Sequence, residues 1–321
     1  MTKPFNSKLA SYMEGLVAEK RASGFDFSLG ESTLHSFDSF IIENDLDSGC
    51  LDEAVVRRWE LLRPTENLNT RNSRLQVVRA LALYMQALGL EVCHPLGHAS
   101  QVRSVPYIPE REEIRQFFAY LDLRGNPRNP FPRMNIEYSI LFRLYYCCGL
   151  RLNEAVMLKR EDVDLDRGVL YIRHSKGDKD RLVHLADDFR DLVQAYDATM
   201  QQRFLNDRVW FFPGKSDDSH FSKTAIDKRF AQFWMAAFPD WKGRRPTVHC
   251  LRHAFVVHRM NDWVGAGNEL SALMPYLSRY LGHSSISDTM YYYHQLDAHS
   301  DSVRTFMESC DFVSREVARC R

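Results

Sequence analysis

The chain has 321 residues, 45% of them hydrophobic, and its 42 Lys and Arg are balanced by 42 Asp and Glu. This length favours about two domains, and the apolar content is ample for buried cores. A net charge of zero argues against a DNA-binding protein, because affinity for phosphates normally shows as a basic excess. No apolar run is long enough to span a bilayer, so we expect a soluble, cytoplasmic protein without membrane contact.

The cysteines indicate neither disulfides nor a zinc site. There are seven of them, an odd number, and no two stand in C-x-x-C spacing. Such a pattern is typical of reduced thiols.

The first 90 residues are predicted to form a small helical bundle. Apolar residues recur at helical spacing in three segments, and residues that favour turns separate them. The segments cover residues 9–17, 34–41 and 75–88.

The last helix of this bundle is predicted to begin at Asn69-Thr70, which would act as its cap. It is expected to expose Arg71, Arg74 and Arg79 on a face away from the apolar stripe. Solvation is the ordinary interpretation of such a charged face.

Proline, glycine and serine interrupt the pattern from Cys93 to Pro109. We therefore expect an N-terminal helical domain over residues 1–94, a linker over 95–108 and a second domain over 109–321. A helix should open the second domain at Pro109, because proline and acidic residues suit a helix start.

A strongly apolar segment, residues 136–148, is predicted to be a buried helix. Gly149 ends it and delivers Arg151 to the start of the next helix. Glu154 follows one turn later and could orient Arg151.

A β-hairpin is predicted next, from β-rich runs at residues 169–174 and 181–185 around a polar tip. Lys176 stands at the entrance of the tip, and Lys179 and Arg181 follow it. Helices are expected again over residues 187–205 and 222–238. The predicted fold class is therefore mainly α with a small antiparallel β-sheet.

Polar chemistry is concentrated between Thr247 and His294. The segment contains His249-Cys250-Leu251-Arg252-His253, then Leu281-Gly282-His283, then Tyr291-Tyr292-Tyr293-His294. Buried polar groups each demand a partner, so a core alone would not favour this composition. A basic turn with Arg244 and Arg245 precedes the segment, and either faces DNA or is a solvated loop.

Taken together, these boxes resemble the tyrosine recombinase (phage integrase) family. The family pattern has an Arg in a Gly-Leu-Arg-x-x-Glu turn, a Lys on a β-hairpin, a His-x-x-Arg box, a Leu-Gly-His box and a Tyr nine positions after that last His. The likeness covers roughly residues 107–294. In this sequence the matching residues are Arg151, Lys176, His249, Arg252, His283 and Tyr292.

The resemblance implies cleavage and rejoining of DNA through a 3′-phosphotyrosine, without metal, ATP or other cofactor. Arg151 and Arg252 would supply fixed positive charge to the phosphate. His249 would accept a proton, and Lys176 would protonate the departing 5′ oxygen. Lys179 and Arg181 are the alternatives to Lys176 on this hairpin, and Lys179 is the one that could replace it as the general acid.

The nucleophile is assigned by spacing. Counting nine residues from His283 selects Tyr292, and neighbours on a helix diverge by about 100°, so Tyr291 and Tyr293 would point elsewhere. His283 would hydrogen-bond a non-bridging phosphate oxygen.

The family also implies partners. We expect double-stranded DNA with an inverted-repeat core site, and a homotetramer on two synapsed sites, either alone or with related recombinases. The helical N-terminal domain would grip the far side of the duplex. Contact of Arg71, Arg74 and Arg79 with DNA phosphates is therefore an open alternative to their solvation. An amphipathic helix at residues 300–321 would dock on a neighbouring protomer or fold back on its own domain.

Several alternatives remain open from the sequence. A type IB topoisomerase would share this site, and a DNA-binding accessory factor would keep the fold with a silent site. A zinc site at His249, His253 and His258 is disfavoured, because the Glu of H-E-x-x-H is missing and Arg252 would repel a cation. Residues 261–270 are expected to form an enlarged loop. The DNA target and the kind of mobile element are not specified.

Overall fold

The computed structural model describes residues 4–95, 106–124, 132–175, 179–204, 208–214, 219–243, 245–283, 285–290 and 292. The chain divides into two compact units, Met1–Val105 and Pro106–Arg321, each with its own hydrophobic core. The boundary between them falls inside the segment predicted to be a linker. Across the described ranges, no helix is long and apolar enough to cross a membrane.

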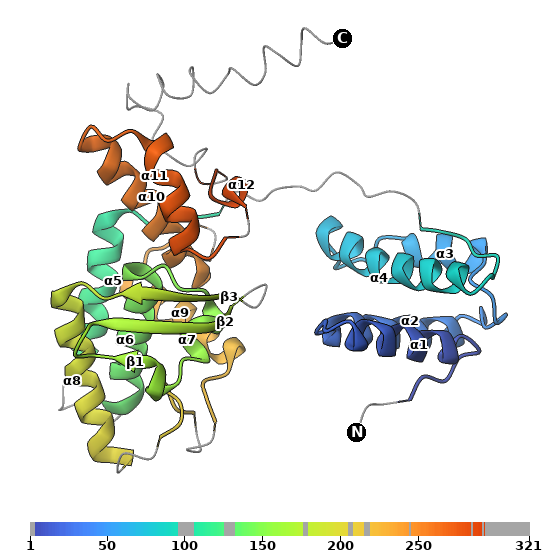
Figure 1. The fold of residues 1–321 in the computed structure, drawn as a ribbon, viewed down its shortest axis with the longest axis horizontal. Helices are drawn as coiled ribbons and strands as arrows, with labels where there is room; N and C mark the ends of the chain where they lie inside the picture. Colours follow the sequence, from blue (N-terminus) through green and yellow to red (C-terminus); the bar gives the residue numbers. More distant parts are fainter. Residues whose placement is uncertain are drawn as a thin grey trace, which may run out of the picture. The chain divides into compact units, whose positions relative to one another are not determined.

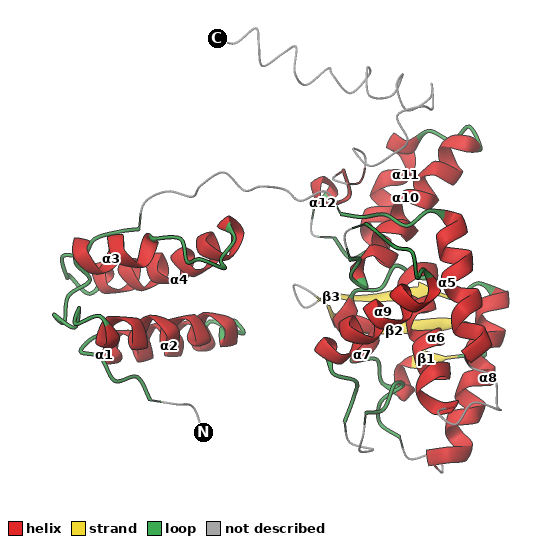
Figure 2. Ribbon diagram, turned by 180° about the vertical axis from the view of Figure 1, so that it is seen from behind, coloured by secondary structure: helices red, strands yellow, loops and turns green. Residues whose placement is uncertain are grey.

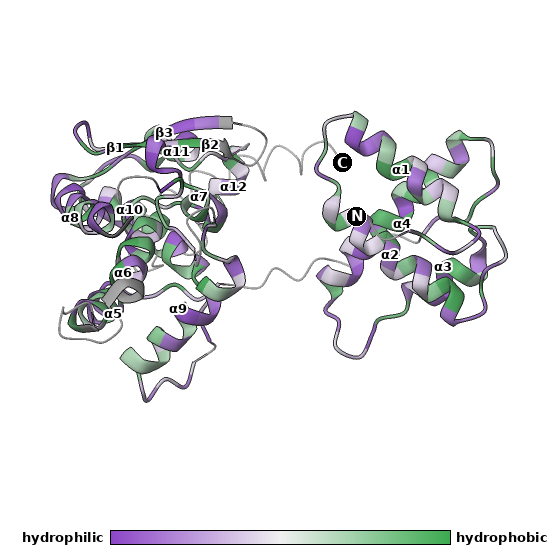
Figure 3. Ribbon diagram, turned by 90° about the horizontal axis from the view of Figure 1, so that it is seen from below, coloured by the Kyte–Doolittle hydropathy of each residue, from purple (hydrophilic) through white to green (hydrophobic). Residues whose placement is uncertain are grey.

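The first unit is helical, as expected. Its helices are α1 (Ala10–Ala22), α2 (Ser28–Glu43), α3 (Glu53–Glu60) and α4 (Leu68–Ala87). Each helix carries both hydrophobic and hydrophilic residues (Figure 3), and the apolar ones pack around Phe37 and Trp59. Apolar spacing missed α3, although Asp52 caps it by accepting a hydrogen bond from the Val55 backbone N–H.

The cap of α4 was predicted two residues too late. Asn67, not Asn69-Thr70, is the N-cap, and its Oδ1 accepts a hydrogen bond from the backbone N–H of Thr70 at 2.9 Å. An asparagine in extended conformation just before the first turn satisfies one of the orphan N–H groups there.

The prediction that Arg74 lies on an exposed face was wrong. Arg74 is only 6% exposed, and its guanidinium forms a two-pronged ion pair with Glu66, at 2.8 Å to each carboxylate oxygen. It also donates to the carbonyls of Trp59 and Leu61. A buried guanidinium requires such partners, and the carbonyls at the end of α3 provide them.

The two neighbouring arginines on α4 are half-buried rather than freely exposed. Arg71 Nε donates to the Glu60 carbonyl at 2.5 Å, and Arg79 Nη2 donates to the Pro95 carbonyl at 2.8 Å. These bonds tie α4 to the segments on either side of it, a structural role that sequence spacing did not indicate.

The second unit confirms the predicted fold class, helices with a small antiparallel sheet. Its helices are α5 (Arg111–Arg124), α6 (Pro132–Cys147), α7 (Leu152–Val156), η1 (Arg160–Asp162), α8 (Asp187–Phe204), α9 (Lys223–Ala237), α10 (His249–Gly265), α11 (Leu270–Tyr280) and α12 (Ile286–Met290). Its described strands are β1 (Val163–Asp164), β2 (Val169–Ser175) and β3 (Lys179–His184), in the order β1-β2-β3.

The sheet packs against one side of the helical layer. Figure 1 shows the strands in front of α6 and α9, and Figure 2, seen from behind, shows these helices in front of the strands. Helices α5, α6 and α9 pack around an aromatic core that includes Phe117, Phe142, Phe230 and Trp234. This rigid scaffold carries the ends of β3, α6, α10 and α11, from which the polar boxes project.

The β2–β3 hairpin forms as predicted, with Ile172 opposite Arg181 and Ser175 opposite Lys179. The short strand β1 pairs with β2 and was not foreseen. Residues 176–178, including Lys176, lie outside the described residues.

The prediction of an enlarged loop at residues 261–270 was wrong. Most of that segment completes α10, which runs to Gly265, and a short turn at Gly267 leads into α11. Trp263 packs against the adjacent hydrophobic cluster, and Asp262 accepts from Arg111 Nη2 at 2.5 Å. These contacts extend the helix through polar residues that resemble a loop in the sequence.

Candidate active site

Gly149 brings Arg151 to the site by turning the chain between α6 and α7. It has a φ of +60°, which favours glycine. A Cβ at this position would lie 2.5 Å from Phe255 Cδ1, so no side chain fits. The turn ends a buried helix at a fixed point and places Arg151 at the N-cap of α7.

Arg151 is held by a carboxylate and a backbone carbonyl. Its Nη1 donates to Glu154 Oε1 at 2.8 Å, and its backbone N–H donates to Glu154 Oε2 at 2.7 Å. Its Nη2 donates to the Gly282 carbonyl at 2.6 Å. The role predicted for Glu154, orienting Arg151, agrees with this geometry.

Arg252 is the most buried charge of the site, with 2% of its surface exposed. Its guanidinium donates to the carbonyls of Gly149 and Leu281 and to the ring of His283. Burial lowers the pKa of Arg252 to about 10, so it stays protonated at neutral pH. Fixed main-chain acceptors hold its positive charge in one orientation before any substrate arrives.

The ring of His283 links Arg252 to α12. Nε2 lies 3.0 Å from Arg252 Nη2, and Nδ1 lies 2.7 Å from Thr289 Oγ1. Since a guanidinium N–H can only donate, Nε2 accepts and the ring proton belongs on Nδ1. Thr289 is fully buried, and no sequence motif marked its role in orienting the imidazole.

His249 lies beside the two arginines at the start of α10. Burial, followed by the positive charges of Arg252 and Arg151, lowers the pKa of His249 to about 4. His249 is nevertheless exposed at the surface, and solvent screens part of this effect. Its imidazole is therefore neutral, and able to accept a proton, at neutral pH.

His253 supports the tyrosine that was selected by spacing. Its ring centroid lies 4.5 Å from that of His249 and 5.3 Å from that of Tyr292. The Tyr292 ring is parallel to that of His283, with centroids 6.4 Å apart. Burial lowers the pKa of His253 to about 3, and the neighbouring His249 and Arg252 add to this effect.

The two arginines, His249, His283 and Tyr292 line one cavity of about 180 Å³. Tyr292 is only 4% exposed and packs against Phe255 and the cluster around it. The cavity thus combines fixed positive charge, neutral imidazoles and a phenol, a composition suited to a phosphodiester. Its lining residues are Arg151, His249, Arg252, Gly282, His283, Asp288 and Tyr292.

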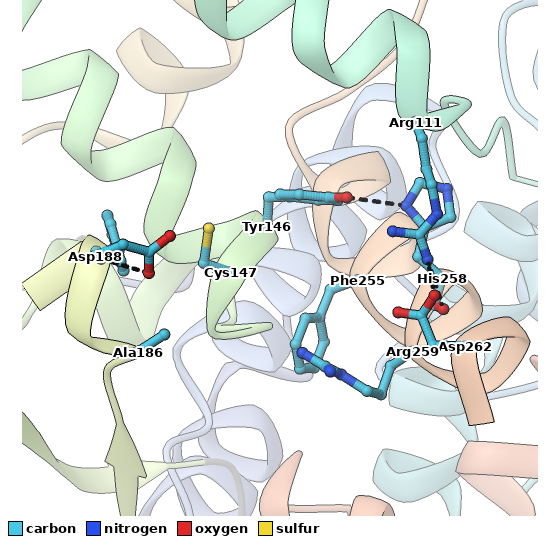
Figure 4. Close-up of a pocket in the computed structure, with 10 residues that line it drawn as sticks. Arg111, Tyr146, Cys147, Ala186, Asp188, Phe255, His258, Arg259 and Asp262 are labelled. Carbon is cyan, nitrogen blue, oxygen red and sulfur yellow. Dashed lines mark hydrogen bonds and ion pairs between the residues drawn. The ribbon is translucent and has the colours of Figure 1, made fainter. Parts of the chain in front are cut away.

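Of the three histidines considered as metal ligands, His249 and His253 lie side by side, and His258 lies apart from them. His258 belongs to a different cavity of about 220 Å³, where its Nδ1 lies 3.1 Å from the Tyr146 hydroxyl. Figure 4 shows this contact, with Arg111 reaching toward Asp262 beside it. In the part of the chain that the structure describes, no group of three His, Cys, Asp or Glu residues could hold a metal ion.

The other residues considered for the site differ in their surroundings. Arg245 is exposed in the turn before α10. Arg181, considered only as an alternative to Lys176, is instead a buried partner of Glu154. Outside the described residues lie Lys176, Arg244, Tyr291, Tyr293 and the segment 300–321.

Comparison with known proteins identifies the family. The model of the phage integrase family matches residues 111–299. The integrase/recombinase y4rE of Sinorhizobium fredii is 38% identical over 297 residues, 88% of this chain and 91% of that protein. Tyrosine recombinase XerA of Thermococcus kodakarensis is 28% identical and covers 67% of this chain and 68% of its own length.

The fold has solved counterparts. The XerH site-specific recombinase, in a pre-cleavage complex with its difH substrate, aligns with a TM-score of 0.64 and 18% identity over 88% of this chain and 79% of that one. The chain therefore belongs to the phage integrase family. The predicted class of enzyme, a tyrosine-type site-specific DNA recombinase, is thereby confirmed.

Proposed function

We propose that this enzyme cleaves and rejoins DNA through a covalent bond between Tyr292 and a 3′ phosphate. The observation that carries the proposal is the cavity in which the Tyr292 ring lies with Arg151, His249, Arg252 and His283. Cleavage would form a bond from the phenol oxygen to phosphorus and break the bond from phosphorus to the 5′ oxygen. The 5′ hydroxyl would reverse these steps when it rejoins the strand.

The two arginines would replace a metal ion. Both guanidiniums are anchored by protein acceptors, so positive charge is in place before the phosphate arrives. Loss of one preorganised donor of this kind costs about 3 kcal/mol in the transition state, or roughly two orders of magnitude in rate. The covalent intermediate conserves the phosphodiester energy, so the reaction would need no ATP.

Proton transfer would complete the chemistry. A tyrosine with its ordinary pKa of about 10 needs an acceptor at neutral pH, and His249 would take its proton. Lys176 would protonate the leaving 5′ oxygen, as the family motif implies. An incoming phosphate would compete with His283 for the N–H groups of Arg252. His283 would then donate to a non-bridging oxygen, which requires its ring proton on Nε2 rather than on Nδ1.

The proposed assembly is a homotetramer on two synapsed double-stranded DNA sites, each with an inverted-repeat core, in the cytoplasm. XerH was crystallised with its DNA substrate, which supports DNA as the partner here. Since Arg71, Arg74 and Arg79 bond within their own unit, the proposed phosphate contact rests more on the exposed Arg245 and its neighbour Arg244.

The proposal is tested with a nicked DNA substrate that traps the covalent adduct. Wild-type protein should form an adduct that survives denaturation, and Tyr292→Phe should form none while binding DNA with unchanged affinity. Tyr276→Phe is the matched control, because Tyr276 is an exposed tyrosine of the same unit.

Other outcomes separate the alternatives. Adduct formation by Tyr292→Phe would move the nucleophile to Tyr291 or Tyr293. DNA binding without any wild-type adduct would show the silent accessory factor. Relaxation of supercoiled DNA without strand exchange between two sites would show a type IB topoisomerase.

A further inference from the structure

Glu154 binds two guanidiniums at once. Its Oε1 accepts from Arg151 Nη1 and Arg181 Nη1, each at 2.8 Å. Its Oε2 accepts from the Arg151 backbone N–H and from Arg181 Nη2, each at 2.7 Å. Arg181 therefore makes the two-pronged pair that suits a guanidinium and a carboxylate, while Arg151 bonds to the same oxygens from the other side.

Arg181 also reaches the segment that carries the Leu-Gly-His box. Its Nε donates to the Tyr280 carbonyl at 2.8 Å. Gly282 lies against both arginines, because a Cβ there would be 3.2 Å from Arg151 Nη1 and 3.2 Å from Arg181 Nη1. One side chain of β3 thus connects the end of α11, the start of α7 and the hairpin.

The position of Arg181 indicates an indirect role in catalysis. Its side chain is 9% exposed, all three of its guanidinium nitrogens donate to protein acceptors, and it does not line the Tyr292 cavity. It cannot take the place of Arg151 at a phosphate. It can, however, determine where Glu154 holds Arg151.

Glu154 needs the bonds from Arg181 to stay in the position that orients Arg151. A single carboxylate lies between two positive charges, and its lone pairs are divided between them. Without Arg181, Glu154 would keep its bonds from Arg151 but lose the two bonds that connect it to β3 and, through Arg181, to α11. A rotation of the carboxylate could then shift Glu154 together with the guanidinium bound to it.

We propose that Arg181 is a positioning residue that holds Arg151 in its phosphate-binding orientation through Glu154. This inference rests on the proposed phosphotyrosine reaction. It assigns a role in that reaction to a side chain that never touches the DNA.

The test compares two substrates. In a methylphosphonate, a methyl group replaces one non-bridging oxygen and removes the negative charge that Arg151 would neutralise. Arg181→Met should form the adduct about 100-fold more slowly than wild type on normal DNA, the cost expected of misplacing a catalytic group by about an ångström. On the methylphosphonate, the two proteins should react at similar rates.

Arg143→Met is the matched control. Arg143 is also a largely buried arginine in an ion pair, with 14% of its side chain exposed and its Nη2 2.7 Å from Oδ2 of the exposed Asp122, but it contacts no residue of the site. It should leave both rates unchanged. A second check is that Arg151→Ala combined with Arg181→Met should react no more slowly than Arg151→Ala alone.

Equal slowing of Arg181→Met on both substrates, or a further loss in the double variant, would overturn the proposal, because a general structural defect predicts both. If Arg181→Met does not fold, Arg181→Lys, which keeps the charge but not the fork, gives the same comparison. Absence of an adduct with the wild-type protein would instead defeat the phosphotyrosine reaction itself, which separates the two failures.

Discussion

Replacement of Gly282 by alanine adds one methyl group where Arg151 and Arg181 meet. Gly282 has a φ of +64°, and the added Cβ would lie 3.2 Å from Nη1 of each arginine and 3.4 Å from Arg181 Cδ. Both guanidiniums would have to move by a few tenths of an ångström. We expect this change to impair cleavage more than stability.

Gly267 offers a matched control for the backbone. Its φ is +76°, and a Cβ there would meet nothing within 4 Å. Alanine in this conformation costs about 1 kcal/mol at either position. In a unit of this size, that cost lowers the melting temperature by about 2–4 °C.

Catalysis should distinguish the two variants. Because a full ångström of misplacement costs roughly 100-fold, a shift of a few tenths should slow adduct formation by about 10-fold in Gly282→Ala. Gly267→Ala should react at the wild-type rate. The measurements are thermal unfolding by circular dichroism and single-turnover adduct formation at saturating protein.

Two results would refute this reasoning. If Gly282→Ala and Gly267→Ala lose equal stability and cleave equally fast, the contact of Gly282 with the two arginines has no catalytic consequence. If Gly282→Ala loses several kcal/mol more than Gly267→Ala, the effect is on packing rather than on the orientation of Arg151.

Two further outcomes are expected. Lys176→Ala should cleave normal DNA slowly but recover on DNA with sulfur at the 5′-bridging position, since a thiolate leaves without a proton; rescue of Lys179→Ala instead would reassign the general acid. The pKa of His249 is lowered to about 4, so its neutral, proton-accepting form predominates above that pH. The second-order rate constant of adduct formation, which reports the free protein, should therefore fall only as the pH approaches about 4. An acid limb centred near pH 6.5 and absent from His249→Asn would contradict this.

Local patterns predicted most helices correctly. Apolar spacing located α1, α2 and α4, and the segment before Gly149 is the buried helix α6. Such patterns work because the period of a helix is set by its own backbone. They failed for α3, which is short, and for the end of α10, where polar residues continue the helix through contacts with distant partners such as Arg111.

Motif spacing identified residues that the structure then brings together. Arg151, His249, Arg252, His283 and Tyr292 come from four separate motifs and line one cavity. The spacing of the motifs identified these residues because each lies at or near the end of a helix, and the helix fixes the position of its side chain. Nothing in the local sequence indicated that Thr289 orients His283.

The burial of individual charges depends on distant parts of the chain. In the sequence, Arg74 and Arg181 resemble ordinary surface residues. The structure buries both, because Glu66 lies beside Arg74 and Glu154, 27 positions away in the sequence, lies beside Arg181. An arginine enters a core only where acceptors surround its guanidinium.

The sequence by itself determined the class of this enzyme and the identity of the residues proposed for its chemistry, because reactive side chains and the turns that present them follow local rules. Only the tertiary structure decided which arginines line the Tyr292 cavity and which bond to the protein away from it. Arg151, Arg181 and Arg252 carry the same group, and their roles differ because the carbonyls and the carboxylate around each one come from elsewhere in the fold.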